Sequence, residues 1–286
     1  MPTPAPASPV LAADIAALAV DRVSFSYPAP GRRRAACAAL TDVSLSVAQG
    51  SLTGLLGANG CGKTTLLKLL SGVDTPDSGR VSLAGRALTR IPRRELARQV
   101  AVVPQETQPA FDYTVTEMAL MGRHPHLGRF ELEGPADLAA VERALETTGV
   151  AHLADRLFST LSGGEKQRVV IASALAQAGS VLLLDEPTAS LDLAYQLEVA
   201  SLLARLNREQ RVTIVLATHD LNLAASICDS LVLLREGRVL AQGWTSEVLN
   251  ASMVRDLYGI DADVRFHDGA GHLTVTPVRR ASVEAG

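Results

Sequence analysis

The sequence predicts an α/β protein with a largely parallel, buried sheet, and two observations lead to this fold class. Three short runs are nearly continuously apolar, as expected for strands that are covered on both faces. They are "QVAVVPQ" at 99–105, "SVLLLDEP" at 180–187 and "VTIVLATH" at 212–219. Segments with helical spacing of apolar residues lie between them, and this alternation is typical of an α/β sheet.

Composition is that of an ordinary globular protein. The 286 residues are 47% hydrophobic and 20% charged, with a formal net charge of −3. This is sufficient for one large domain or two small ones. A near-neutral chain lacks the basic footprint of nucleic-acid binding, so we expect no nucleic-acid partner. No apolar run approaches the roughly 18 to 20 residues that a membrane-spanning helix needs.

The first residues and the cysteines favour an intracellular chain. Residues 1–15 begin with the Pro-rich stretch "MPTPAPASPV". Because this stretch has no basic region, we expect a disordered tail and not a signal peptide. The three cysteines, Cys37, Cys61 and Cys228, have no CxxC spacing, and we expect them to be reduced thiols.

The main domain is predicted at 16–244. Alternating apolar and polar residues at 17–27 and 40–50 predict half-buried strands near its start. The loop between them carries Arg32–Arg34, which we interpret as a solvated turn without a role. Helical periodicity without a clear strand predicts a helical insert at about 106–178.

A C-terminal extension is predicted at 245–286. Its first part, "TSEVLNASMVRDLYG" at 245–259, has the spacing of a single helix. Two alternating strands follow, joined by a turn that contains Asp268 and Gly269. We therefore expect a helix and a β-hairpin appended to the main domain.

A phosphate-binding loop lies early in the main domain. Gly57, Gly62, Lys63 and Thr64 fit the pattern G-x-x-x-x-G-K-[ST] between a predicted strand and a predicted helix. Glycines let backbone N–H groups turn towards phosphates, and the start of the helix adds partial positive charge. Lys63 would reach the β- and γ-phosphates, whereas Lys68, one turn later, is expected to be a solvated helix residue.

Two adjacent carboxylates end the strand at 181–185. A buried strand that ends in Asp185 and Glu186 is costly unless a cation or water lies there. We expect Asp185 to hold Mg²⁺ through water, with Thr64 as a direct ligand, and Glu186 to polarise an attacking water. A helix cap after the strand is the alternative.

A second anion-binding helix start occurs at "LSGGEKQR", residues 161–168. Ser-Gly-Gly before a helix presents backbone N–H groups and the helix dipole to an anion. One nucleotide cannot readily use both helix starts within one subunit. The sequence therefore favours a head-to-tail pair, in which Ser162 and Gly164 of each copy close over the nucleotide of the other.

Together these motifs resemble the nucleotide-binding subunits of ATP-binding cassette (ABC) transporters, over nearly the whole chain. The matches in chain order are Tyr27 (adenine stacking), Gly57–Thr65 (Walker A), Gln105 (Q-loop), Leu161–Glu165 (signature), Asp185–Glu186 (Walker B), Ser190–Asp192 (D-loop) and His219 (switch histidine). The resemblance implies a P-loop NTPase, RecA-like core with an antiparallel β subdomain, a helical subdomain and a small C-terminal extension.

The resemblance also implies roles for individual residues. The implied catalytic residues are Lys63, Gln105, Glu186 and His219, with His219 sensing the γ-phosphate. The implied ATP contacts are Tyr27, Gly57, Asn59, Gly60, Cys61, Gly62, Lys63, Thr64, Thr65, Ser162, Gly163, Gly164 and Asp192. The implied Mg²⁺ residues are Thr64, Gln105 and Asp185. For Tyr27, packing at the strand edge explains an aromatic residue equally well.

Within this family, "TVTEMALMGRHPHLGRF" and the C-terminal extension resemble subunits of importers for iron-siderophores, haem and cobalamin. Zinc or manganese importers remain an alternative cargo class. The resemblance implies a homodimer, two integral-membrane permease subunits and, indirectly, a periplasmic or lipoprotein solute-binding protein. It places the chain at the cytoplasmic face of the bacterial inner membrane, as a peripheral subunit.

The sequence disfavours two other functional classes. A soluble ABC ATPase of DNA repair or translation would resemble tandem cassettes or carry long coiled coils, and the sequence has neither. A regulatory binder without hydrolysis is disfavoured because Glu186 and His219 are both present. The other histidines lack metal-ligand spacing and are expected to be structural, although His124 and His126 could line a partner surface.

One position departs from the family pattern. Cys61 stands where the Walker A loop usually has serine. Nothing in the chemistry of the loop forbids a thiol there. We therefore expect a thiol alkylator to inhibit ATP hydrolysis and bound MgATP to protect against it.

Overall fold

The computed structural model describes residues 16–28, 37–177 and 179–280. The predicted tail at 1–15 and the loop with Arg32–Arg34 lie outside these ranges. Within them, no helix combines the length and the apolar character needed to cross a bilayer.

The central sheet has six strands in the order β10-β9-β3-β8-β7-β6. Neighbours from β9 to β6 pair in parallel, and β10 is antiparallel at one edge. The strands are β3 (Leu52–Leu56), β6 (Val100–Val103), β7 (Val181–Asp185), β8 (Thr213–Thr218), β9 (Ser230–Arg235) and β10 (Arg238–Trp244). This arrangement confirms the predicted α/β class.

Both faces of the central sheet are covered, as the continuous apolar runs predicted. In β7, Leu182 and Leu184 belong to one hydrophobic cluster, whereas Val181 and Leu183 belong to another on the opposite face. Alternation of side chains along a strand produces this division. Because the inner strands β3, β7 and β8 are buried along their whole length, a polar side chain can reach solvent there only beyond the strand ends.

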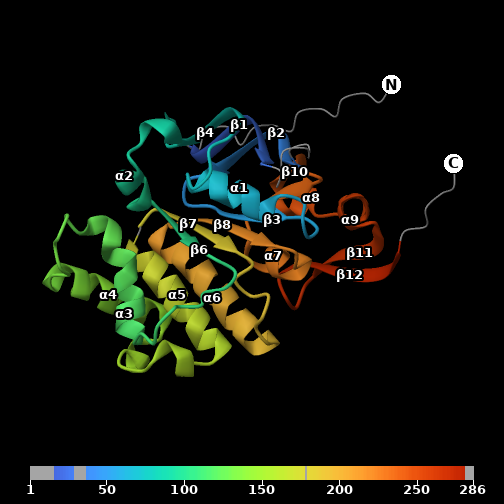
Figure 1. The fold of residues 1–286 in the computed structure, drawn as a ribbon. Coiled ribbons are helices and arrows are strands. Elements are labelled where there is room, and N and C mark those ends of the chain that lie inside the picture. The colour runs from blue at the N-terminus through green and yellow to red at the C-terminus, as the bar shows by residue number, and fades with distance from the viewer. Residues whose placement is uncertain (1–15, 29–36, 178, 281–286) are drawn as a thin grey trace.

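One face packs against α1 (Lys63–Leu70) and a second, antiparallel sheet (Figure 1). That sheet has the order β2-β1-β4-β5. Its strands are β1 (Ala16–Tyr27), β2 (Cys37–Ala48), β4 (Ser78–Leu83) and β5 (Arg86–Ala87). The two early strands predicted from alternating residues are thus confirmed as an antiparallel pair.

Helices cover the opposite face. They include a helical region between β6 and β7, together with α6 and α7. The bounds are α3 (Val115–Leu120), η2 (Met121–His126), α4 (Pro135–Thr148), η3 (Ala151–Leu153), η4 (Phe158–Thr160), α5 (Gly163–Gln177), α6 (Leu193–Gln210) and α7 (Leu221–Ile227). By contrast, η1 (Leu88–Arg90) and α2 (Arg93–Ala97) precede β6 and pack on the α1 side, through Leu88 and Leu96. No strand occurs at 106–177, where an isolated bridge pairs Thr114 with Leu157.

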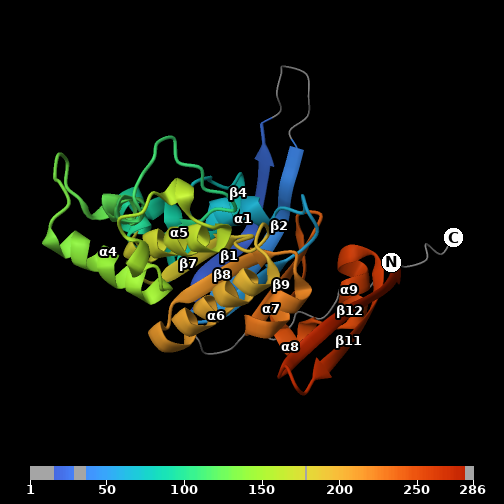
Figure 2. The ribbon, with the colours of Figure 1, turned by 90° about the horizontal axis from the view of Figure 1, so that it is seen from below.

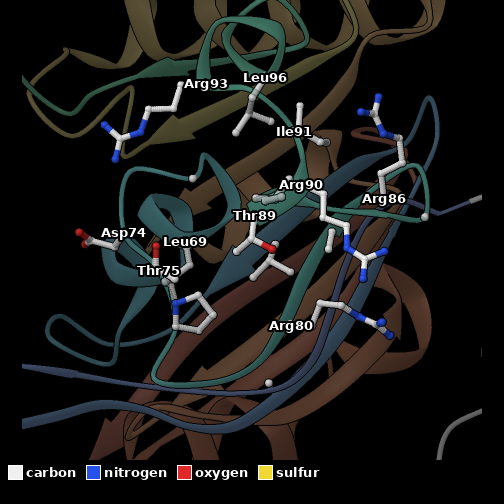
Figure 3. Close-up of a pocket in the computed structure, with 17 residues that line it drawn as sticks. Leu69, Asp74, Thr75, Arg80, Arg86, Thr89, Arg90, Ile91, Arg93 and Leu96 are labelled. Carbon is white, nitrogen blue, oxygen red and sulfur yellow. The ribbon is translucent and has the colours of Figure 1, made fainter.

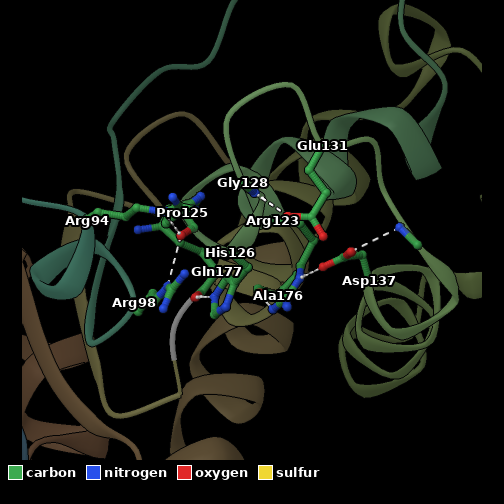
Figure 4. Close-up of polar contacts among 11 residues, drawn as sticks. Arg94, Arg98, Arg123, Pro125, His126, Gly128, Glu131, Asp137, Ala176 and Gln177 are labelled. Atoms are coloured by element: carbon green, nitrogen blue, oxygen red, sulfur yellow. Dashed lines mark hydrogen bonds and ion pairs between the residues drawn. The ribbon is translucent and has the colours of Figure 1, made fainter.

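Hydrogen bonds connect the helical region between β6 and β7 to α2, which precedes β6 (Figure 4). Arg94 and Arg98, at α2, both donate through Nε to the carbonyl oxygen of Pro125, at 2.7 and 2.9 Å. The ring of His126 lies 2.7 Å from the carbonyl oxygen of Gln177. This gives His126 a structural contact.

The C-terminal extension differs in part from the prediction. The single helix expected at 245–259 is divided into α8 (Thr245–Val248) and α9 (Ala251–Tyr258). Asn250 interrupts it, because its side chain accepts a hydrogen bond from the backbone of Met253 and caps a new helix. The predicted hairpin is present as β11 (Ile260–His267) and β12 (His272–Arg280), with β12 against α7 (Figure 2).

A buried asparagine joins α6 to the loops around the central sheet. The Nδ2 atom of Asn207 donates to the carbonyl oxygens of Gly50 and Val212, at 2.8 and 3.0 Å. Asn207→Ala leaves both carbonyls without this donor, so we expect the free energy of unfolding in urea to fall by about 2 kcal/mol. Glu209→Ala, at an exposed position of the same helix, serves as the control. Equal effects of the two substitutions would contradict the assignment.

Candidate nucleotide-binding site

The candidate residues gather where parallel strands end. Register places Leu56, the last residue of β3, beside Thr218 of β8, and Asp185 of β7 beside Ala217. The carboxyl ends of these strands and of β6 therefore share one edge of the sheet. Gly57, Glu186 and His219 directly follow their strands, and Gln105 lies two residues after the end of β6.

The Walker A loop folds tightly over its own lysine. Gly62, immediately before α1, has φ of 109°, a conformation that favours glycine. A β-carbon at Gly57 would lie 2.3 Å from the carbonyl oxygen of Leu234. The Lys63 side chain is 5% exposed, and its Nζ donates to the carbonyls of Gly57 and Ala58 at 2.9 and 3.4 Å. Asn59 and Gly60 form the exposed tip.

One carboxylate links the lysine to the histidine. Glu186 Oε1 lies 3.4 Å from Lys63 Nζ, and Oε2 lies 3.0 Å from His219 Nδ1. Glu186 has φ of 47°, which is unusual for a residue with a side chain. Its backbone N–H donates to the carbonyl of Ala217 at 2.9 Å, and this bond fixes the turn. A strained backbone of this kind costs about 1–3 kcal/mol and is common at functional sites.

Asp185 has the environment of a cation ligand. Its residue is 8% exposed, and among the described residues its carboxylate has no hydrogen-bond or ion-pair partner. Thr64 is exposed in the first turn of α1, which contacts β7. A buried carboxylate and a hydroxyl are oxygen donors that suit Mg²⁺, which also keeps several waters. No group of three or more His, Cys, Asp or Glu side chains forms a metal site in the described residues.

Gln105 is the least constrained member of the site. It follows β6 at the same sheet edge and is exposed. Within the described ranges, its side chain forms no hydrogen bond with Lys63 or Glu186. The fold thus places Gln105 near the edge without fixing its side chain.

Tyr27 lies against the first turns of α1. Its hydroxyl is 3.2 Å from Thr65 Oγ1, and Lys68 Nζ lies 5.7 Å from the centre of its ring. The residue is 36% exposed, with Phe25 packed against it edge to face. Lys68, expected to be a solvated helix residue, is exposed in α1 and also has an aromatic neighbour. The position of the Tyr27 ring is compatible both with stacking on the base of a nucleotide and with packing at the edge of the β-sheet.

The signature segment forms a capped helix start. The backbone N–H of Ser162 donates to Glu165 at 2.8 Å, and this bond lowers the pKa of the Glu165 carboxyl. Gly164 is required here because a β-carbon would lie 2.3 Å from the Tyr195 ring at the start of α6. Gly163 is exposed. Asp192 accepts from the backbone of Tyr195 at 3.2 Å and so caps α6.

The signature segment and the Walker A loop remain apart within one chain. No hydrogen bond or ion pair joins residues 162–164 to residues 57–65 in the part of the chain that is described. The structure thus brings Lys63, Glu186 and His219 together and leaves Ser162 and Gly164 outside this cluster.

The Cys61 thiol points into the loop. Cys61 is 7% exposed, and a β-carbon at Gly57 would lie 2.4 Å from its sulfur. Burial raises the pKa of the thiol, and the nearby Lys63 offsets part of this rise. Alkylation of Cys61 is therefore expected to be slow.

A pocket of about 700 Å³ lies away from this cluster, at the far end of α1. Four arginines line it, but Figure 3 shows Arg93 directed away from Arg80 and Arg90. Arg86 already pairs with Glu95 at 2.6 Å. The arginines do not converge on a common point, so the pocket does not form a second phosphate site.

Sequence reasoning did not single out Tyr258 as a neighbour of the site. The Tyr258 hydroxyl donates to the carbonyl oxygen of His219 at 3.4 Å, across 39 positions in the sequence. Helical periodicity predicted a helix there but carries no information about its contacts. No local signal could have found this pair.

Comparison with known proteins agrees with this geometry. The chain is 43% identical to a cobalamin import ATP-binding protein of Halobacterium salinarum, over 84% of the chain and 60% of that protein. The chain thus spans less than two thirds of the length of that relative. It is 41% identical to an iron(3+)-hydroxamate import ATP-binding protein of Bacillus subtilis, over 78% of the chain and 83% of that protein.

Solved structures give the same result. A structure described as a metal-chelate type ABC transporter in an inward-facing conformation matches with a TM-score of 0.79 and 30% identity, over 92% of this chain and 98% of that one. A component of the cbiONQ complex of Clostridium perfringens matches with a TM-score of 0.71 and 30% identity, over 85% and 94%. The family profile described as "ABC transporter" matches residues 40–189. The chain therefore belongs to the ABC transporter family.

Proposed function

We propose that this chain is the subunit that binds and hydrolyses ATP to power a membrane importer. The single observation that carries the proposal is the Glu186 carboxylate, which follows β7 and lies between the buried Lys63 ammonium and the His219 ring. Phosphoryl transfer to water needs positioned charge more than covalent chemistry. A buried cation, a carboxylate and a histidine at one sheet edge supply it.

Each of the three residues has a distinct proposed task. Lys63 is shielded from water, so its attraction for a phosphate is stronger than it would be at the surface. Glu186 accepts the proton of the attacking water or polarises that water. The His219 side chain is half-exposed to solvent, so its ring can donate a hydrogen bond to the γ-phosphate of a bound nucleotide.

Mg²⁺ is proposed as the cofactor. Thr64, Gln105 and Asp185 would hold it, and the feature that supports its presence is the Asp185 carboxylate, which has no polar partner within the described ranges. When bound, the ion neutralises charge on the β- and γ-phosphates. The remaining contacts to ATP are proposed for the Walker A loop and Tyr27.

Two copies are proposed to close head to tail on two ATP molecules. The start of α5 offers Ser162, Gly163 and Gly164 to an anion through the helix dipole and backbone N–H groups. Because this start lies outside the Lys63 cluster of its own chain, the partner's nucleotide is its proposed target. Asp192 is proposed to lie at the same contact.

Permease subunits are the proposed membrane partners. A pocket of about 350 Å³ lies between residues 107–112 and the segment before α5. Phe111 is 72% exposed there, which suits contact with an apolar partner segment. The proposed cargo is a metal chelate such as an iron-siderophore, haem or cobalamin, as in the names of the relatives, and the proposed location is the cytoplasmic face of the inner membrane. A zinc or manganese importer is the second candidate.

The role of Glu186 is tested by Glu186→Gln. Loss of the carboxylate removes the base, so we expect MgATP hydrolysis by the purified protein to fall about 100-fold. ATP binding should persist, and the variant should elute as a dimer with MgATP. Glu142→Gln, at an exposed glutamate of α4, is the control. Wild-type rates in Glu186→Gln would eliminate the mechanism.

The Cys61 thiol is tested with iodoacetamide in a Cys37→Ser background, because Cys37 is exposed. We expect slow inactivation that accelerates from pH 7 to pH 9, since a raised pKa leaves little thiolate at neutral pH. MgATP should protect, and Cys61→Ser should resist. Unchanged hydrolysis after mass spectrometry shows complete Cys61 labelling would refute the placement of this thiol at the nucleotide.

The importer assignment is tested by purifying the tagged chain from detergent-solubilised membranes of its own cells. We expect two copies of the chain with two copies of a polytopic permease. Genes for a solute-binding protein beside that of the permease would provide a protein whose bound cargo can be identified by mass spectrometry. Recovery with ribosomes or DNA, and without a membrane protein, would overturn the assignment.

A further inference from the structure

The C-terminal extension reaches the candidate site through Tyr258, the last residue of α9. Its hydroxyl donates to the main-chain carbonyl of His219, whose ring contacts Glu186. Tyr258 belongs to none of the nucleotide-binding motifs. The extension thus contacts the backbone of the residue that the proposed mechanism uses to sense the γ-phosphate.

A second contact holds the helix that follows His219. Asn222 and Val275 form a reciprocal pair: the Val275 N–H donates to Asn222 Oδ1 at 2.8 Å, and Asn222 Nδ2 donates to the Val275 carbonyl at 3.2 Å. Asn222 lies in the first turn of α7, which Asp220 caps. The hairpin therefore fixes the start of α7, three residues after His219.

The extension also borders the Walker A loop. A pocket of about 400 Å³ is lined by residues 58–61 of the loop and by residues 255–259 at the end of α9. Arg235, which also lines this pocket, donates to the carbonyl of Asp256 at 2.7 Å and so holds α9 beside it. The end of α9 thus lies beside the loop that carries Lys63 and also contacts the backbone of His219.

The Tyr258 hydroxyl is suited to act as a donor. Burial raises its pKa, and Cys61, Glu186 and Asp220 raise it further. A hydrogen bond with the backbone of Gly57 offsets part of the rise in this pKa. The hydroxyl keeps its proton at neutral pH and can donate it to the His219 carbonyl.

We propose that Tyr258 is a positioning residue that holds His219 in register with Glu186, and that the C-terminal extension thereby sets the rate of ATP hydrolysis. The effect on rate rests on the proposed function; the effect on the geometry of His219 does not. Displacement of α9 would slow hydrolysis without any change in the atoms that touch ATP.

Tyr258→Phe tests the proposal, because it removes only the hydroxyl and keeps the ring. Thr274→Val is the matched control: it removes a hydroxyl of the same extension that bonds within the hairpin, to the carbonyl of Arg265. We expect kcat for MgATP to fall about threefold in Tyr258→Phe, the effect of one hydrogen bond. The KM for MgATP should change less than twofold, and Thr274→Val should match the wild type.

A second readout does not require hydrolysis. The ring resonances of His219, assigned with His219→Ala, should shift in the NMR spectrum of nucleotide-free Tyr258→Phe and stay in place in Thr274→Val. Unshifted resonances, an unchanged kcat in active protein, or an equal loss in Thr274→Val would overturn the proposal. A wild-type protein without ATPase activity would instead overturn the proposed function, and a shifted resonance would then still support the positioning role.

Discussion

The architecture depends on one buried charge, the ammonium group of Lys63. A side chain that is 5% exposed loses most of its water, so oxygen atoms of the protein must replace that water. Two loop carbonyls and Glu186 provide them. The glycines of the Walker A loop are needed for the same reason, because the loop must turn its carbonyls inward over the lysine and has no room for side chains at Gly57. Such a lysine remains available to an anion that can compete for its hydrogens.

The parallel sheet supplies the other half of this arrangement. Its inner strands β3, β7 and β8 are buried on both faces, so their carboxyl ends are the places where charged side chains can meet the solvent. Chain segments far apart in sequence end side by side there, and this brings Glu186 to Lys63 and His219. The unusual φ of Glu186 is held by a bond to the strand next to it. Geometry that would be unfavourable in isolation is therefore imposed by neighbouring strands.

Local signals in the sequence were sufficient for part of this picture. The apolar runs predicted the buried strands, and glycine spacing predicted the loop before α1. The prediction of one continuous helix at 245–259 was wrong. It followed the spacing of the apolar residues and overlooked Asn250, which caps a second helix. Contacts between remote segments had no signal at all: Tyr258 meets His219 only after α9 packs beside β9 and the Walker A loop. The inward direction of Cys61 likewise depends on packing and not on its place in a motif.

The attachment of the helical region has a consequence for how this protein can change over evolutionary time. The acceptor at position 125 is a main-chain oxygen, and every amino acid carries one there. Replacement of Pro125 would therefore leave the acceptor in place, provided that the backbone keeps its path. The donors of these two hydrogen bonds, in contrast, are side-chain groups, the guanidinium groups of Arg94 and Arg98. Substitution of Arg94 or Arg98 during evolution would remove a donor and weaken the attachment of the helical region to α2. Substitution of Pro125 would not remove the acceptor, so the attachment is less sensitive to change at that position.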